Sequence, residues 1–434
     1  SRILLDCGMD VTANDKNAYP HFEAPEFNIN ELDAVILTHP HLDHSGLIPY
    51  LFKMGYRGPV YCTAPTRDIA SLLALDLIGV SFKEAKNPLY SSTDVKEMVK
   101  HTICVNYEEV CDITPDVRLT LYNAGHTLGS AMAHLHIGNG LHNFLYTGDL
   151  KAIKTRLLEA AVTQFPRLET LMIEATYGGK DNVLPPRKDS EQILAATIKR
   201  TIERNGKILI PVLGVGRAQE LMLIVHDLIE KKEIPTVPVY IQGMVWDVTA
   251  IHTTYPDYLN LNIKKAIFHR DNNPFLSEIF KRVGSAEERK QIIEEEGPCI
   301  ILATSGMMTG GASVEYFREL ADNPKNTIVF VSYQGEGALG SRIQRGEKEI
   351  TMSGEGGKQE IVPVRLEVVS LEGLSGHAGR SELIKFIDNL SPKPKKIIIV
   401  HGENSRCLDL ASSLHKMYNV ETNAPKNLEV IRIK

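Results

Sequence analysis

The sequence predicts an α/β protein of two domains, in which the second domain is inserted into the first. At 434 residues the chain is longer than one small hydrophobic core requires. Short apolar runs rich in β-branched residues alternate with segments of helical periodicity, as in layered α/β folds. The character of the sequence changes near Gly178 and returns to its first style near residue 371. We therefore expect a first domain at residues 1–177 and 371–434, and an inserted domain at residues 178–370.

The first domain is expected to contain short strands that end in polar residues. Apolar runs with turn signals on either side predict the strands "DAVILTH", "GPVYCTAPT", "VRLTLYNAG", "SAMAHLHIGNGLHNFLYTGD" (a hairpin) and "TLMIEAT". The segment "SGLIPYLFKMG" is expected to form a helix with Ser45 near its N-cap. The polar, proline-rich stretch "GGKDNVLPPRKD" leads into the inserted domain, where strand, loop and helix repeat. The run "KKIIIVHGE" resumes the style of the first domain.

Composition and charge exclude several classes of protein. No apolar run approaches the roughly 18 residues that a membrane span requires. The start, "SRILLDCGMD", does not have the pattern of a signal peptide. The 6 cysteines form no CxxC pair, which argues against a disulfide framework and indicates a reducing, cytoplasmic environment. A net charge of −6 does not by itself indicate nucleic-acid binding, although bound cations are missing from that count.

The stretch "LTHPHLDHSG", Leu37 to Gly46, carries the densest group of coordinating side chains. His39, His41, Asp43 and His44 follow a buried apolar run directly, and their charged forms would repel one another. A metal ion is the usual compensation for such crowding. Ordinary turn histidines would explain one such residue but are a poor explanation for the whole pattern.

Further candidate ligands stand at the ends of other predicted strands. The carboxyl ends of strands in an α/β sheet meet at one edge, so these side chains can converge. Imidazole and carboxylate groups suit Zn²⁺ in a site with an open position. One ion would be bound by His39, His41 and His126, and a second by Asp43, His44 and His401. Asp149 would bridge the two ions, which at about 3.5–4 Å apart stabilise both attacking and leaving oxygens in a displacement.

These motifs resemble those of a known family. "HPHLDH", "GHTLGS" and "YTGD" are similar to the motifs of the metallo-β-lactamase fold, while "IEATYGG", "SGHAGR" and "IIIVHGE" resemble the extra motifs of its β-CASP nuclease branch. "PVLGVGRAQE" and "TSGMMTGG" are similar to the endonuclease group of the cleavage and polyadenylation specificity factor (CPSF), and "YPHFEAPEFNINELDAV" resembles its archaeal members. The resemblance implies an αββα sandwich with an inserted α/β β-CASP domain.

The resemblance also implies roles for individual residues. Asp6, in "LLDCG", matches a carboxylate that orients a ligand histidine. Glu174 and His377 match a pair that protonates the leaving oxygen, with the glutamate holding the imidazole. Asp43 is counted with this pair among the catalytic residues as well as among the metal ligands.

The function implied is that of a two-zinc ribonuclease which cuts single-stranded RNA in the cleft between the two domains. The expected products carry a 5′-phosphate and a 3′-hydroxyl. Cleavage is expected to be internal and to serve RNA 3′-end processing, decay or transcription termination. A 5′–3′ exonuclease activity is an additional expectation. The family also implies a homodimer. Because the family usually has strands before "SRILLDCG", we expect that these N-terminal strands are missing here.

Two glycine-rich loops between a strand and a helix are candidates for binding phosphate through backbone N–H groups. In "GVGRAQE" the residue Gln219 stands where a dinucleotide-binding loop needs glycine, and no GxxxxGK loop occurs, so no nucleotide cofactor is expected. The candidate phosphate and RNA contacts in the inserted domain are Gly216, Arg217, Thr304, Ser305, Gly306 and Arg342.

Three other functions remain open from the sequence. The same metal site would suit a small-molecule hydrolase, although such a substrate needs no inserted domain. A non-catalytic RNA-binding subunit is disfavoured because every ligand position is filled. A DNA nuclease is the third alternative. A second HxH pair, His134 and His136 with His142 nearby, has no carboxylate at ligand spacing, so these histidines are expected at exposed strand positions.

Overall fold

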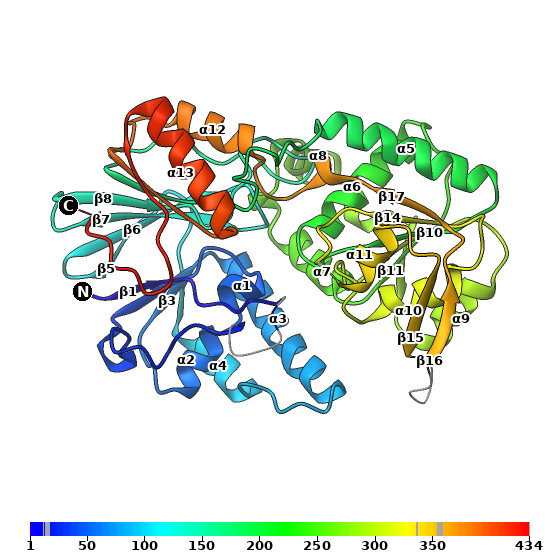
Figure 1. Cartoon of the computed structure of the whole chain (residues 1–434), viewed down its shortest axis with the longest axis horizontal. Helices are drawn as coiled ribbons and strands as arrows, with labels where there is room; N and C mark the ends of the chain where they lie inside the picture. Colours follow the sequence, from blue (N-terminus) through cyan, green and yellow to red (C-terminus); the bar gives the residue numbers. More distant parts are fainter. Residues whose placement is uncertain (12, 14–17, 336, 354–358, 434) are drawn as a thin grey trace. The chain divides into compact units, whose positions relative to one another are not determined.

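The computed structural model describes residues 1–11, 13, 18–335, 337–353 and 359–433, and it divides into two compact units. Unit 1 comprises Ser1–Val183 and Gly376–Lys434, and unit 2 comprises Leu184–Ser375. The divisions therefore follow residues 183 and 375, a few residues after the boundaries expected at 177 and 370. Figure 1 shows the elements of each unit.

Unit 1 contains two sheets that lie face to face (Figure 1). The first is parallel, with strand order β1-β2-β3-β4: β1 (Ile3–Leu5), β2 (Ala34–Ile36), β3 (Val60–Cys62) and β4 (Thr102–Cys104). The second has the order β19-β18-β9-β8-β7-β6-β5: β5 (Val110–Thr114), β6 (Val117–Asn123), β7 (Ala131–Ile137), β8 (His142–Tyr146), β9 (Thr170–Glu174), β18 (Lys396–Val400) and β19 (Glu421–Asn423). Its strands pair antiparallel from β5 to β8 and parallel from β8 to β19.

Helices cover the outer faces of both sheets in unit 1. They are α1 (Leu42–Ser45), α2 (Ile48–Lys53), α3 (Ala64–Lys83), α4 (Ser92–His101), α12 (Arg380–Asn389) and α13 (Asn404–Tyr418). Ile36, Leu121 and Phe144 belong to the core between the sheets, whereas Phe52 belongs to the layer between the first sheet and α2–α4, and Phe386 to the layer between the second sheet and α12 and α13. These three apolar layers make the unit an αββα sandwich, which confirms the predicted fold class.

Two local predictions for unit 1 are wrong. Ser45 does not cap one long helix, because it ends the short helix α1 and its Oγ donates to the Pro40 carbonyl. Pro49, at the start of α2, has no N–H with which to continue α1. His134 and His142 are buried rather than exposed, because both faces of their sheet are covered. His134 Nε2–H donates to the Arg167 carbonyl at 2.7 Å.

Unit 2 is built on a parallel sheet with helices on both faces (Figure 1). The strand order is β12-β11-β13-β10-β14-β17: β10 (Ile208–Pro211), β11 (Val239–Gln242), β12 (Phe280–Val283), β13 (Ile300–Ala303), β14 (Thr327–Phe330) and β17 (Glu367–Ser370). A hairpin of β15 (Glu349–Ser353) and β16 (Gln359–Pro363) packs against this core. The helices are α5 (Arg187–Glu203), α6 (Arg217–Glu230), α7 (Val245–Thr254), α8 (Leu261–Arg270), α9 (Ala286–Glu294), α10 (Ala312–Leu320) and α11 (Leu339–Gln344).

Nowhere in the described ranges does a helix combine the length and the apolar character that crossing a membrane requires.

Helix α7 holds a fully buried histidine that links the stability of unit 2 to pH. His252 donates its Nδ1–H to the Val248 carbonyl at 2.8 Å, while its Nε2 is buried without a hydrogen-bond partner. Burial lowers the pKa of His252 to about 4. As the pH falls, His252 therefore binds a proton near pH 6.5 in the unfolded chain but only near pH 4 in the folded chain. The free energy of unfolding is therefore unaffected by His252 above about pH 6.5 and decreases as the pH falls from there to about 4.

We expect the substitution His252→Leu to remove this acid-sensitive term, which amounts to about 3 kcal/mol at pH 4. Urea unfolding at pH 7 and pH 4.5 measures the loss of stability. The fluorescence of Trp246, the single tryptophan of the chain, serves as a local reporter on the same helix. The exposed His269→Leu serves as the matched control. An equal acid loss in wild type and His252→Leu would contradict the assignment.

Candidate metal centre

The ends of five strands in unit 1 deliver the predicted ligands and acids. His39, His41, Asp43 and His44 follow β2, and the last two lie in α1. His126 follows β6, Asp149 follows β8, Glu174 is the last residue of β9, and His401 follows β18. All of these strands end on the same side of the sandwich, so residues far apart in sequence meet at one edge.

Three groups of possible ligand atoms form there, each with its atoms within 4.8 Å of one another. The first is His39, His41, His126 and Asp149. The second is Asp43, His44, Asp149 and His401. The third is Asp149, Glu174 and His377. Asp149 is the member common to all three groups.

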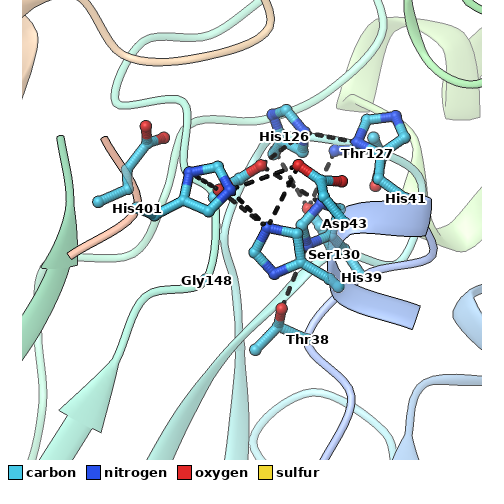
Figure 2. Close-up of polar contacts among 12 residues, drawn as sticks. Thr38, His39, His41, Asp43, His126, Thr127, Ser130, Gly148 and His401 are labelled. Carbon is cyan, nitrogen blue, oxygen red and sulfur yellow. Dashed lines mark hydrogen bonds and ion pairs between the residues drawn. The ribbon is translucent and has the colours of Figure 1, made fainter. Parts of the chain in front are cut away.

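Asp149 offers a different oxygen to each of the first two groups. Its Oδ2 lies 3.4 Å from His39 Nε2 and 3.6 Å from His126 Nε2. Its Oδ1 lies 3.4 Å from His44 Nε2 and 3.3 Å from His401 Nδ1. Figure 2 shows the rings of His39, His41, His126 and His401 close together with Asp43. The carboxylate thus has the geometry of a bridging ligand.

The polar atoms at the centre of these groups suit a metal cation. His39 Nε2, His41 Nε2 and both carboxylate oxygens of Asp149 are buried without a hydrogen-bond partner. Buried polar atoms are rarely left unpaired, and a buried carboxylate needs a positive charge. The ring nitrogens of His41 and His126 also face each other at 3.1 Å. A divalent cation with nitrogen and oxygen ligands satisfies these atoms together.

Asp6 orients two of the histidines. It accepts a hydrogen bond from His44 Nδ1–H at 2.7 Å, which leaves His44 Nε2 facing Asp149. It also accepts from the backbone N–H and the hydroxyl of Thr38, each at 2.7 Å. The Thr38 hydroxyl lies 3.2 Å from His39 Nδ1, so Asp6 fixes His39 through Thr38 (Figure 2). A fourth donor is the hydroxyl of Tyr146 at 3.0 Å.

Two further partners orient ligand rings. His126 Nδ1–H donates to the Gly376 carbonyl at 3.0 Å, which turns Nε2 towards His41 and Asp149. His401 Nδ1 lies 3.2 Å from the Thr176 hydroxyl. Sequence reasoning missed Thr38, Thr176 and Gly376, although each stands next to or within a recognised motif.

Comparison with known proteins agrees with this geometry. The Metallo-beta-lactamase superfamily domain matches residues 1–175, the Beta-Casp domain matches residues 218–343, and the Zn-dependent metallo-hydrolase RNA specificity domain matches residues 361–425. Proteins named transcription termination factor FttA align with the whole chain and with 68% of their own length. They include those of Methanocaldococcus jannaschii (55% identical), Thermococcus kodakarensis (52%) and a Lokiarchaeum species (50%).

The chain belongs to the FttA family. This membership confirms the resemblance to the archaeal β-CASP metallo-β-lactamase proteins. It also makes the chain a member of a metallo-hydrolase family, in agreement with the buried groups of histidine and aspartate.

The candidate ligand histidines of this FttA-family chain fall into two classes, one with lowered and one with raised pKa. Burial lowers the pKa of His39 and of His126, so both rings are neutral and ready to bind a cation. Burial also disfavours charge on His401, but Asp149 and Asp43 outweigh it and raise its pKa to about 9. The carboxylates raise the pKa of His44 in the same way. A cation entering the second group therefore displaces protons.

Close packing explains two glycines of the FttA-family chain beside the ligands. A Cβ atom at Gly8 would collide with the backbone of Asp43. Gly148 has a positive φ of 50°, and a Cβ there would press on the Thr38 side chain. Asp6 and His401 also have left-handed backbones, with φ of 58° and 51°. Such conformations in non-glycine residues typically cost about 1–3 kcal/mol and cluster at functional sites.

Glu174 and His377 lie together beside the ligand groups. His377 Nδ1 is 3.3 Å from Glu174 Oε1 and 3.8 Å from Asp149 Oδ2. Glu174 is completely buried and accepts backbone N–H groups from Leu150 at 2.9 Å and from Thr176 at 3.3 Å. Burial alone lowers the pKa of His377, but Glu174 and Asp149 outweigh it and raise the pKa above its ordinary value. The pair therefore favours a protonated imidazole near neutral pH.

The candidate phosphate loops of the FttA-family chain lie in unit 2. Gly216 and Arg217 start α6 after β10, and Thr304, Ser305 and Gly306 follow the neighbouring strand β13. The two loops touch, because a Cβ at Gly306 would meet the backbone of residues 212 and 213. Arg342, on α11, instead forms an ion pair with Glu347 at 2.7 Å. The two loops are therefore in contact, whereas Arg342 is paired with Glu347.

We expect Asp6→Asn to weaken metal binding in unit 1, because an amide group would confront donors from Thr38 and His44. Metal affinity should fall about 10–100-fold, and the free energy of unfolding should fall by about 1–3 kcal/mol. Zinc retained per chain under chelator competition and thermal unfolding measure the two effects. The control is Asp112→Asn, an exposed aspartate paired with Arg118. Full zinc retention by Asp6→Asn would refute the orienting role.

Proposed function

We propose that the chain is a two-zinc endoribonuclease that hydrolyses single-stranded RNA to 5′-phosphate and 3′-hydroxyl ends. The observation that carries this proposal is the position of Asp149, whose two oxygens face separate groups of histidine nitrogens. A carboxylate shared in this way suits a pair of cations and the displacement reactions that such pairs promote.

The first zinc ion would be held by His39, His41, His126 and Asp149. The second would be held by Asp43, His44, Asp149 and His401. Nitrogen and oxygen ligands without thiolates fit hydrolytic zinc. When bound, two such ions activate a water molecule and offset the charge that develops on the phosphate oxygens.

His377 is proposed to protonate the departing 3′ oxygen of the ribose. Glu174 holds its Nδ1 at 3.3 Å, which leaves Nε2 as the ring atom that can donate a proton to substrate. The raised pKa of His377 fits an acid that must be protonated near neutral pH. Glu174 itself is buried and occupied by backbone N–H groups, so it acts through His377.

Two observations support RNA as the substrate and transcription termination as the setting. The relatives carry the name transcription termination factor, and the matching family models include an RNA specificity domain. We propose that this chain likewise forms RNA 3′ ends by cutting transcripts, with unit 2 contacting phosphates through the loops of Gly216–Arg217 and Thr304–Gly306. The homodimer implied by the family stays a prediction.

The first test is product mapping on single-stranded RNA labelled at either end, with zinc-loaded wild type, His401→Ala and His269→Ala. We expect internal cuts with 5′-phosphate ends from wild type and from His269→Ala, an exposed histidine of unit 2. His401→Ala should lose at least about 100-fold in rate, because one ligand group is incomplete.

Other outcomes would replace parts of the proposal. Stepwise loss from the 5′ end would keep the chemistry but make the enzyme an exonuclease. Equal cutting of single-stranded DNA would favour the DNA nuclease. If the zinc-loaded, folded chain does not cut RNA but hydrolyses a lactone or thioester, the small-molecule hydrolase would be favoured.

A second prediction concerns His377. We expect His377→Gln to cut ordinary RNA about 10²–10⁴-fold more slowly than wild type, the usual contribution of a general acid. A strand with sulfur in place of the bridging 3′ oxygen should lose far less, because a thiolate leaves without a proton. Single-turnover rates on the two strands measure the difference. Equal losses on both strands would exclude proton donation by His377.

A further inference from the structure

Lys151 is a buried cation two residues after Asp149, and none of the motifs accounts for it. Its side chain is only 3% exposed, and its Nζ lies 2.9 Å from a carboxylate oxygen of Glu382 in the first turn of α12. The same Nζ donates to the backbone carbonyl of His377 at 2.9 Å. Burying an ammonium group is costly unless it is paired and hydrogen-bonded, so its place next to His377 requires an explanation.

The backbone of Lys151 is itself fixed. Its N–H donates to the Ala124 carbonyl at 2.9 Å, and its carbonyl accepts from the Ala161 N–H at 2.9 Å. The side chain therefore extends from an anchored point towards the loop that carries His377.

The residue before it, Leu150, completes the attachment of that loop. The Leu150 carbonyl accepts the Ala378 N–H at 2.8 Å, so residues 150 and 151 together hold both polar atoms of the peptide group that joins His377 to Ala378. The Leu150 N–H donates to Glu174 Oε1 at 2.9 Å, and this is the oxygen that faces His377 Nδ1. One short segment thus contacts both members of the Glu174–His377 pair.

We propose that Lys151, held by Glu382, is a positioning residue for His377. Lys151 fixes the carbonyl of His377 and thereby the direction of the imidazole, so that Nδ1 stays on Glu174 while Nε2 points to the leaving oxygen. Neither Lys151 nor Glu382 touches the reacting atoms. The inference rests on the proposed role of His377 as the proton donor, and it adds the residues that keep the donor in place.

The test compares Lys151→Met and Glu382→Gln with Lys154→Met in the 434-residue chain. Lys154 is the matched control, because it forms an exposed ion pair with Glu159 at 2.7 Å. Met keeps much of the length and the apolar stem of lysine but removes the ammonium group. Glu382→Gln leaves the bond from Lys151 to the His377 carbonyl and removes only its charged partner.

The readouts are cleavage of the ordinary and the 3′-sulfur strands, zinc per chain, and hydrogen exchange of the amides in residues 376–379. For Lys151→Met we expect RNA cleavage to fall about 10–100-fold, less than the roughly 10²–10⁴-fold cost of losing the general acid altogether. Cleavage of the sulfur strand should fall less than about threefold by the same reasoning. Zinc content should be unchanged, and exchange at the Ala378 amide should be faster. Glu382→Gln should show the same pattern more weakly, and Lys154→Met should match wild type.

Several outcomes would overturn the inference. Equal losses on both strands with zinc retained would mean that the ion pair only supports the fold. Unchanged rates and exchange in Lys151→Met would mean that His377 needs no such support. If Lys151→Met does not fold, the strand comparison in Glu382→Gln decides. If His377→Gln itself fails to distinguish the two strands, the proposed function fails first, and the faster exchange alone would mark Lys151 as a structural anchor.

Discussion

The carboxylate of Asp149 is the constraint on which unit 1 depends. It is 1% exposed, and neither oxygen has a hydrogen-bond partner. An isolated buried carboxylate costs several kcal/mol, so positive charge must be brought to it from elsewhere in the fold. The αββα sandwich does so by ending five strands at one edge, where histidines surround both oxygens. The architecture is therefore best understood as a support for one shared anion.

The surrounding hydrogen bonds orient the rings of His44, His39 and His126. Asp6 accepts from His44 directly and reaches His39 through Thr38, so one carboxylate serves a histidine in each ligand group. The carbonyl of Gly376 does the same for His126. Rings held in this way lose little further freedom when they bind a cation, which favours tight binding and a defined position for substrate.

The convergence of the candidate ligands was predictable because each motif directly follows an apolar strand, and strand ends in α/β proteins converge. Residues that support these side chains only through tertiary contacts could not be predicted. Thr38 and Lys151 carry no signal of their own, because their partners lie far away in sequence. His134 looked exposed because alternation along one strand does not reveal that both faces of the sheet are covered. The ion pair of Arg342 with Glu347 is likewise a tertiary feature that the motif does not show, and phosphate binding by Arg342 stays a prediction.

Unit 1 is assembled from two stretches of chain separated by the whole of unit 2. His377 and His401 belong to the later stretch, whereas the histidines of the HxHxDH motif belong to the earlier stretch. During synthesis the early histidines therefore leave the ribosome before His377, the proposed acid, and His401, a proposed ligand, have been made. Under the proposed function, the site for cutting RNA is therefore incomplete until the inserted unit and the segment after it have been made.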